Sequence, residues 1–63
     1  MIDGLQKCKG HFVVVDYKTN DKVSYAKGVL EDVLLDEGMI VVKSQEKTWY
    51  LKIDSIMVLR IDE

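Results

Sequence analysis

The chain has 63 residues, of which 48% are hydrophobic and 32% are charged, and its formal net charge is −2. A chain of this length forms one small domain, residues 1–63, and buries only about 60% of its unfolded surface, so its own core is marginal. Cys8 is the one cysteine, which excludes an intrachain disulfide, and with one histidine it excludes the usual four-ligand zinc site within a single chain. Association between copies remains as a way to bury more surface.

Charge and hydropathy also limit the function. No uncharged apolar run approaches the roughly 20 residues of a membrane helix. Residues 1–10 carry charge throughout and lack the apolar centre of a signal peptide. We therefore expect a cytoplasmic protein without a membrane partner. The negative net charge argues against indiscriminate binding to phosphate backbones, but it allows a local basic patch.

The first third of the chain predicts a short helix and a strand. Residues 1–9 carry Ile2, Leu5 and Cys8 at three-residue spacing, which is one apolar stripe of helical period. Gly10 is suited to end this helix, and a frayed tail is the alternative. Residues 12–17 are β-branched and aromatic and predict a strand. The polar residues 18–22 then predict a turn.

A long second strand is predicted over residues 23–35. Gly28 interrupts its alternation, which indicates a bulge or sharp bend where a side chain is not tolerated. Residues 29–35 fit one face of a helix as well as they fit a strand. The strand is favoured because Asp36, Glu37 and Gly38 follow, where glycine suits a left-handed position in a hairpin turn.

Three shorter strands complete the expected fold, at residues 39–42, 48–51 and 56–59, and residues 61–63 are expected to fray. One helix followed by five short strands with short turns predicts a mostly β fold. We expect a five-stranded, strongly bent open barrel of the SH3-like kind. An OB fold is less suitable because it usually needs a longer chain and an inserted helix.

Several segments carry a family resemblance. Residues 5–15, LQKCKGHFVVV, look like an opening helix, a glycine junction and a first strand. The residues Gly28-Val29-Leu30 and Asp36-Glu37-Gly38-Met39 are similar to a Gly-x-Leu segment followed by an Asp-x-x-Met-Asn loop, with two extra residues between them. Residues 51–56, LKIDSI, resemble a hydrophobic-Arg-Gly-x-x-hydrophobic run. Together they resemble the Sm-like family, the LSm and Hfq type of small β-barrel, over nearly the whole chain.

The resemblance implies a subunit of a homo-oligomeric Sm-like ring that binds single-stranded RNA. Its RNA-binding positions fall on Asp36, Gly38, Met39 and Lys52. Ile40 stands where members carry Asn, and Gly38 stands where members stack a base, so the implied RNA binding is weak. Lys52 replaces the commoner Arg and has the alternative of being simply an exposed strand residue, because Lys lacks the rigid bidentate fork of Arg.

The fourth and fifth strands would leave the edges of an open barrel. We expect these apolar, proline-free edges to form the oligomer interface, through Trp49, Leu51, Ile56 and Val58. Adjacent strand residues face opposite ways, so one of Trp49 and Tyr50 packs in the core or interface and the other is free to stack a base or cover a subunit contact. Met57 is expected to pack. The alternative function is an SH3-like oligomeric scaffold that binds protein and no nucleic acid.

Enzyme activity is not expected, and neither is a cofactor. Cys8 and His11 are near each other in the sequence, but nucleophilic catalysis also needs an orienting partner and an oxyanion site. Cys8 is more simply a buried small hydrophobe of the helix stripe. The adjacent carboxylates of Glu31 and Asp32 point to opposite faces of a strand, which is unsuited to paired acid-base chemistry.

Overall fold

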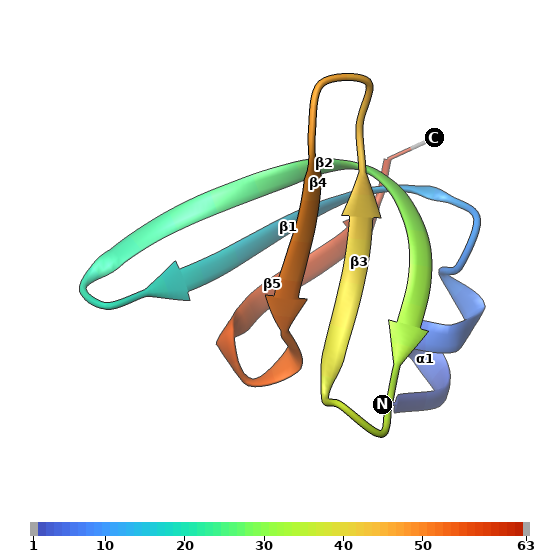
Figure 1. Ribbon diagram of the computed structural model, residues 1–63, viewed down its shortest axis with the longest axis horizontal. Coiled ribbons are helices and arrows are strands. Elements are labelled where there is room, and N and C mark those ends of the chain that lie inside the picture. Colours follow the sequence, from blue (N-terminus) through green and yellow to red (C-terminus); the bar gives the residue numbers. More distant parts are fainter. Residues whose placement is uncertain (1, 63) are drawn as a thin grey trace.

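The protein is described here from a computed structural model that covers residues 2–62. One short helix precedes five antiparallel strands in a single open sheet of order β4-β3-β2-β1-β5 (Figure 1). The elements are α1 (Ile2–Lys7), β1 (Phe12–Thr19), β2 (Lys22–Leu34), β3 (Met39–Lys43), β4 (Thr48–Lys52), the 3-10 helix η1 (Ile53–Ser55) and β5 (Ile56–Ile61). The predicted mostly β class and the order of one helix and five strands are confirmed.

Helix α1 ends as the sequence predicts. After it, the Cys8 N–H donates to the Leu5 carbonyl at 3.1 Å, and Gly10 adopts a left-handed φ of 90°. The Gly10 N–H then donates to the Leu30 carbonyl at 2.8 Å, which ties the end of the helix to the sheet. Leu5 and Cys8 pack against the core, as the predicted stripe requires. The side chain of Ile2, its third member, lies outside the described part of the chain.

The turn between β1 and β2 is tighter than predicted. It consists of Asn20 and Asp21, whereas the sequence predicts a turn over residues 18–22. Lys18 belongs to the ladder and is paired with Val23. Asn20 has a φ of 52°, a left-handed conformation in which Asn is enriched. Residues 18–22 are polar because this hairpin is exposed to solvent. Its tip projects away from β3 and β4 in Figure 1.

Strand β2 is one long bent strand, so the helical alternative for residues 29–35 is wrong (Figure 1). Its residues 22–29 pair with β1, and its residues 29–34 pair with β3. β2 thus joins the two halves of the sheet. The buried residues of the strand are separated by exposed or half-buried ones, and they are Ala26, Gly28, Leu30 and Val33.

The prediction for Gly28 is a bulge or a sharp bend, and no bulge lies at this residue. The register between β2 and β3 shifts between Leu30 and Asp32, whereas Gly28 is paired regularly with Val13 of β1. The backbone around Gly28 nevertheless leaves no room for a side chain, which supports the prediction that a side chain is not tolerated there. A Cβ there would overlap the carbonyl oxygen of Lys43 and lie 2.7 Å from its carbonyl carbon. Close approach of two backbones is the reason for glycine at this position.

The core lies on one face of the bent sheet. Its buried residues are Val13, Val15, Ala26, Leu30, Val33, Ile40, Val42 and Leu51. Partly buried residues from α1 and the turn after it, from β1, from η1 and from the edge strands β4 and β5 pack around them: Leu5, Cys8, Tyr17, Trp49, Ile53, Ile56 and Leu59. Ile61 belongs to β5, and the Asp62 N–H donates to the Phe12 carbonyl at 2.9 Å, so the predicted fraying does not begin at residue 61. Glu63 lies outside the described residues.

Within residues 2–62, no helix has the length and apolar character needed to cross a membrane. The same residues form no group of three or more His, Cys, Asp or Glu side chains that could hold a metal ion.

Candidate functional site

The predicted RNA-binding residues begin in the turn between β2 and β3. The Gly38 N–H donates to the Leu35 carbonyl at 3.1 Å, and Gly38 has a left-handed φ of 68°, as predicted for the hairpin. Asp36 is exposed in this turn. Met39 begins β3 and is half-buried. The turn therefore presents two carboxylates, those of Asp36 and Glu37, and backbone groups to solvent.

Lys52, at the end of β4, lies directly beside this turn. It is the cross-strand partner of Met39, and the N–H of the next residue, Ile53, donates to the Gly38 carbonyl at 2.8 Å. The Ser55 hydroxyl donates to the Lys52 carbonyl at 2.7 Å, which fixes the backbone where β4 ends. The four predicted residues are thus brought together, and we call Asp36, Gly38, Met39 and Lys52 the turn cluster.

The chemistry of the turn cluster is limited. The exposed Lys52 ammonium can contact a phosphate, but Asp36 opposes it with a negative charge. None of the four residues is aromatic, so the cluster has no stacking surface of its own. An aromatic ring does lie next to it. Tyr50 precedes Lys52 by two residues, shares its face of β4 and is 65% exposed.

Trp49 and Tyr50 face opposite sides of β4, as predicted. Trp49 is partly buried against the core, and the Lys47 Nζ lies 4.7 Å from the centroid of its ring. Tyr50 is the exposed member of the pair and is opposite Val41 in β3. Because adjacent residues of a strand point to opposite faces, the sequence predicts that the two rings lie on opposite sides of β4. It does not identify which ring faces the core, because that depends on the register with β3.

The two edges of the sheet are β4 and β5, the strands expected to form an oligomer interface. Trp49 and Ile56 are half-buried, and Val58 is 49% exposed. Leu51 is buried in the chain's own core, so only its backbone lies at the edge. Met57 is 56% exposed, so the expectation that it packs is wrong within the single chain. The edge of β5 is therefore the more apolar and accessible of the two.

Cys8 and His11 are joined by a hydrogen bond between their backbones. The His11 N–H donates to the Cys8 carbonyl at 3.0 Å, in the turn that follows α1. Cys8 itself packs against the core. Asp32, one of the adjacent carboxylates, lies 3.3 Å from the Lys9 ammonium and accepts a 2.8 Å hydrogen bond from the Val33 N–H. These groups have structural partners that account for their positions.

Fold and site together define a class: a mostly β protein with five antiparallel strands in one open sheet and one short helix. Comparison of the chain with protein-family models, with curated proteins and with solved structures gives no match.

Proposed function

We propose that the protein is a subunit of a homo-oligomeric ring of the Sm-like kind, in which β4 of one copy pairs with β5 of the next. The observation that carries this proposal is the strand order, because β4 and β5 are the two ends of one open sheet. In this proposal the bent sheet is the open barrel of an Sm-like domain, and the helix, the long second strand and the motifs around Gly28 and Lys52 support it.

Strand addition at these edges has a physical basis. An edge strand presents unpaired backbone N–H and C=O groups, and the chain contains no proline to block pairing. A contact between different edges is head-to-tail, and such contacts close into a ring when the rotation permits. Apolar burial contributes roughly 25 cal/mol per Å². The charge of −2 on each copy opposes assembly, but salt screens surface charges beyond about 8–10 Å.

Weak binding of single-stranded RNA at the turn cluster is the second part of the proposal. It is supported by the pairing of Met39 with Lys52 and by the hydrogen bond from Ile53 to Gly38, which place the residues together. Affinity is low because the cluster offers one ammonium and no ring. Each missing base stack removes roughly 1–3 kcal/mol.

Lys52→Ala tests this site. In fluorescence anisotropy titrations with labelled oligo-U and oligo-A, the unaltered protein is expected to bind with micromolar or weaker affinity, and the variant is expected to lose that binding. Lys22→Ala is the matched control because Lys22 is also an exposed strand lysine, at the far tip of the β1–β2 hairpin. Tight binding that Lys52→Ala leaves unchanged would place the RNA surface elsewhere.

A protein-binding scaffold is the second candidate. The exposed apolar side chains of Met57 and Val58 on β5, with the negative net charge, favour it. Salt dependence separates the two functions, because contacts to phosphates weaken steeply with salt whereas apolar contacts do not.

A further inference from the structure

One row of side chains on the outer face of the sheet has a carboxylate at its centre. The outer face is the one opposite to the core, and its residues alternate along β1 with the core residues Val13 and Val15. Asp16 of β1 lies in this row between its cross-strand partners, Tyr25 of β2 and Val58 of β5. We call these three residues the anionic row.

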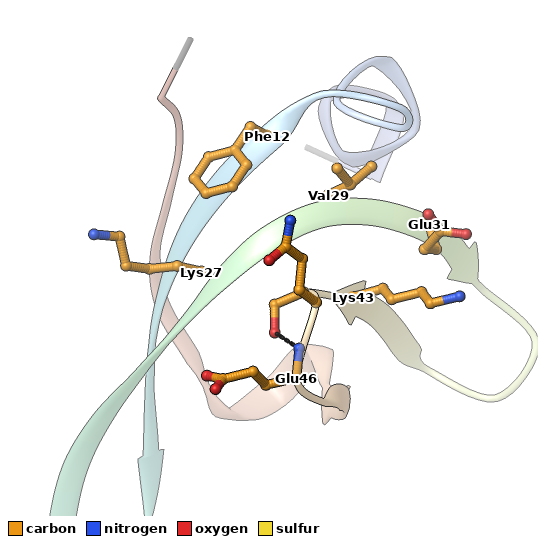
Figure 2. A pocket seen from close by; sticks show the side chains of 8 residues that line it. Phe12, Lys27, Val29, Glu31, Lys43 and Glu46 are labelled. Atoms are coloured by element: carbon orange, nitrogen blue, oxygen red, sulfur yellow. Dashed lines mark hydrogen bonds between the residues drawn. The ribbon is translucent and has the colours of Figure 1, made fainter.

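The next row on the same face carries two cations. Val14 of β1 is paired with Lys27 of β2 on one side and with Arg60 of β5 on the other, and we call these three residues the cationic row. Val14 is buried although it is outside the core, whereas Lys27 and Arg60 are exposed. Figure 2 shows the side chain of Lys27 extended from β2. Long side chains of this kind cover apolar neighbours with their stems and keep their charges in solvent.

The Asp16 carboxylate has no partner within residues 2–62, because the structure gives it neither a hydrogen bond nor an ion pair there. Asp16 is half-buried between a valine and the ring of Tyr25, which is 64% exposed. A carboxylate that has lost part of its hydration is stabilised by a cation brought close to it. The cationic row is about 7 Å away along the strands, at the usual rise per residue.

We propose that this face pairs two copies of the chain about a two-fold axis that runs across the strands, between the two rows. Rotation about such an axis places the cationic row of each copy over the anionic row of the other. Asp16 then lies between Lys27 and Arg60 of the other copy, and the Tyr25 ring lies over the ammonium of that Lys27. Sheets packed face to face are about 10 Å apart, a gap that an aspartate and a long cationic side chain fill together.

The order of the charges favours a second copy over a partner of one charge. An acidic partner meets the carboxylate of Asp16, and a basic partner meets Lys27 and Arg60. A complementary surface must carry the two charges in reverse order at the spacing of the rows. A second copy rotated about this axis presents that surface by symmetry.

The contact is confined to these two rows. One row further along β1, an open concavity hollows the surface next to Phe12 and Val29 (Figure 2). In the pairing this hollow faces the hairpin row of Lys18 and Val23 of the other copy, so no packing is made there. Two rows bury less than the roughly 1,200 Å² of a standard interface, and the contact is therefore weak.

This contact goes beyond the proposed ring. The ring uses the edges of β4 and β5, whereas Asp16, Tyr25 and Lys27 lie on β1 and β2, inside the sheet. Pairing at the edges leaves this face uncovered. The face can therefore join two single chains or two rings, and variants at Asp16 and Lys27 leave both edges unchanged.

Sedimentation at increasing protein concentration tests the pairing. The average mass is expected to rise between about 20 and about 500 μM, toward at least twice its starting value, for a dissociation constant on the order of 100 μM. Asp16→Lys and Lys27→Glu each place like charges opposite one another or remove an attraction, so each is expected to lose most of this rise. Asp21→Lys and Lys22→Glu, the same changes at the exposed hairpin tip, are expected to keep it.

A mixture of the two row variants separates this geometry from a general effect of charge. The introduced lysine of Asp16→Lys lies over the introduced glutamate of Lys27→Glu, and the native Asp16 of the second chain lies over the native cations of the first. An equimolar mixture is therefore expected to rise in mass more than either variant alone at the same total concentration. Far-UV circular dichroism of each variant shows that its fold is intact.

Each other result overturns the pairing. A mass that does not change with concentration would exclude it, and would leave the ring in place if that mass is the mass of a ring. A rise that Asp16→Lys leaves unchanged would assign association to another surface, and a larger rise in that variant would show that the cations receive an acidic surface. A mixture that behaves as its components do would exclude the two-fold arrangement. A monomer at about 20 μM that pairs as described would instead support this contact and count against the ring.

Discussion

Gly28→Val is expected to lower the stability of the fold by about 1–3 kcal/mol, the usual cost of forcing atoms into a packed site. For a domain of this size, each kcal/mol corresponds to roughly 4–8 °C in melting temperature. The cost arises because a Cβ at this position overlaps the carbonyl oxygen of Lys43. That carbonyl belongs to backbone at the end of β3, which is paired with both β2 and β4 and cannot rotate away as a side chain would.

Two other glycines provide controls by thermal denaturation. At Gly4, in α1, a Cβ meets nothing within 4 Å, so Gly4→Ala is expected to leave the melting temperature unchanged or raise it slightly. At Gly38 the space is also free, but the φ of 68° disfavours a side chain, so Gly38→Ala is expected to be destabilising through the backbone alone. An unchanged melting temperature for Gly28→Val would contradict the steric argument.

Val58→Lys is expected to convert the proposed ring into monomers. Val58 lies on the edge strand β5 with half of its surface exposed. In the proposed contact this surface becomes buried against the next copy, and a buried lysine without a partner loses its hydration. Mass measurement by light scattering or sedimentation, at tens of micromolar protein and physiological salt, reports the change directly.

Val23→Lys is the matched control for this experiment. Val23 is also an exposed valine, at 60%, but it lies near the tip of the β1–β2 hairpin, opposite Lys18, and outside both β4 and β5. It is expected to keep the mass of the unaltered protein. A monomeric mass for the unaltered protein under these conditions would remove the ring proposal altogether, whatever the variants show.

Local composition was sufficient to predict most of the fold. The β-branched runs predict the strands, and a glycine after Asp36 and Glu37 predicts the left-handed turn at Gly38 that the structure has. The extent of the β1–β2 hairpin could not be predicted, because Lys18 is a poor strand former alone and is held in the ladder by Val23. The position of the bulge, after Leu30, depends on the register with β3, which a single strand's pattern does not contain.

The candidate sites also differ in how much of each could be predicted from the sequence. Lys52 and the turn before Met39 were grouped by resemblance, and the pairing of β3 with β4 places them together. The sequence does not predict the open concavity beside Phe12, which is lined by residues of β1, β2 and the segment from the end of β3 into the β3–β4 turn. Its residues come from three separate segments, and Phe12 is indistinguishable in the sequence from an ordinary first residue of a core strand. Its position opposite Val29, on the face away from the core, identifies it only once the register is known.

The pairing of β1 with β5 affects the order in which the chain folds. The other three pairings join strands that follow one another and are linked by short turns, whereas Val13 pairs with Ile61 across almost the entire chain. Closing a long loop costs more entropy than closing a short one, and distant pairings slow folding. We therefore expect the hairpins from β1 to β4 to form first and β5 to dock last. Until it does, β1 is itself an open edge that another chain can occupy, so the competition between correct folding and misassembly is decided at this single step.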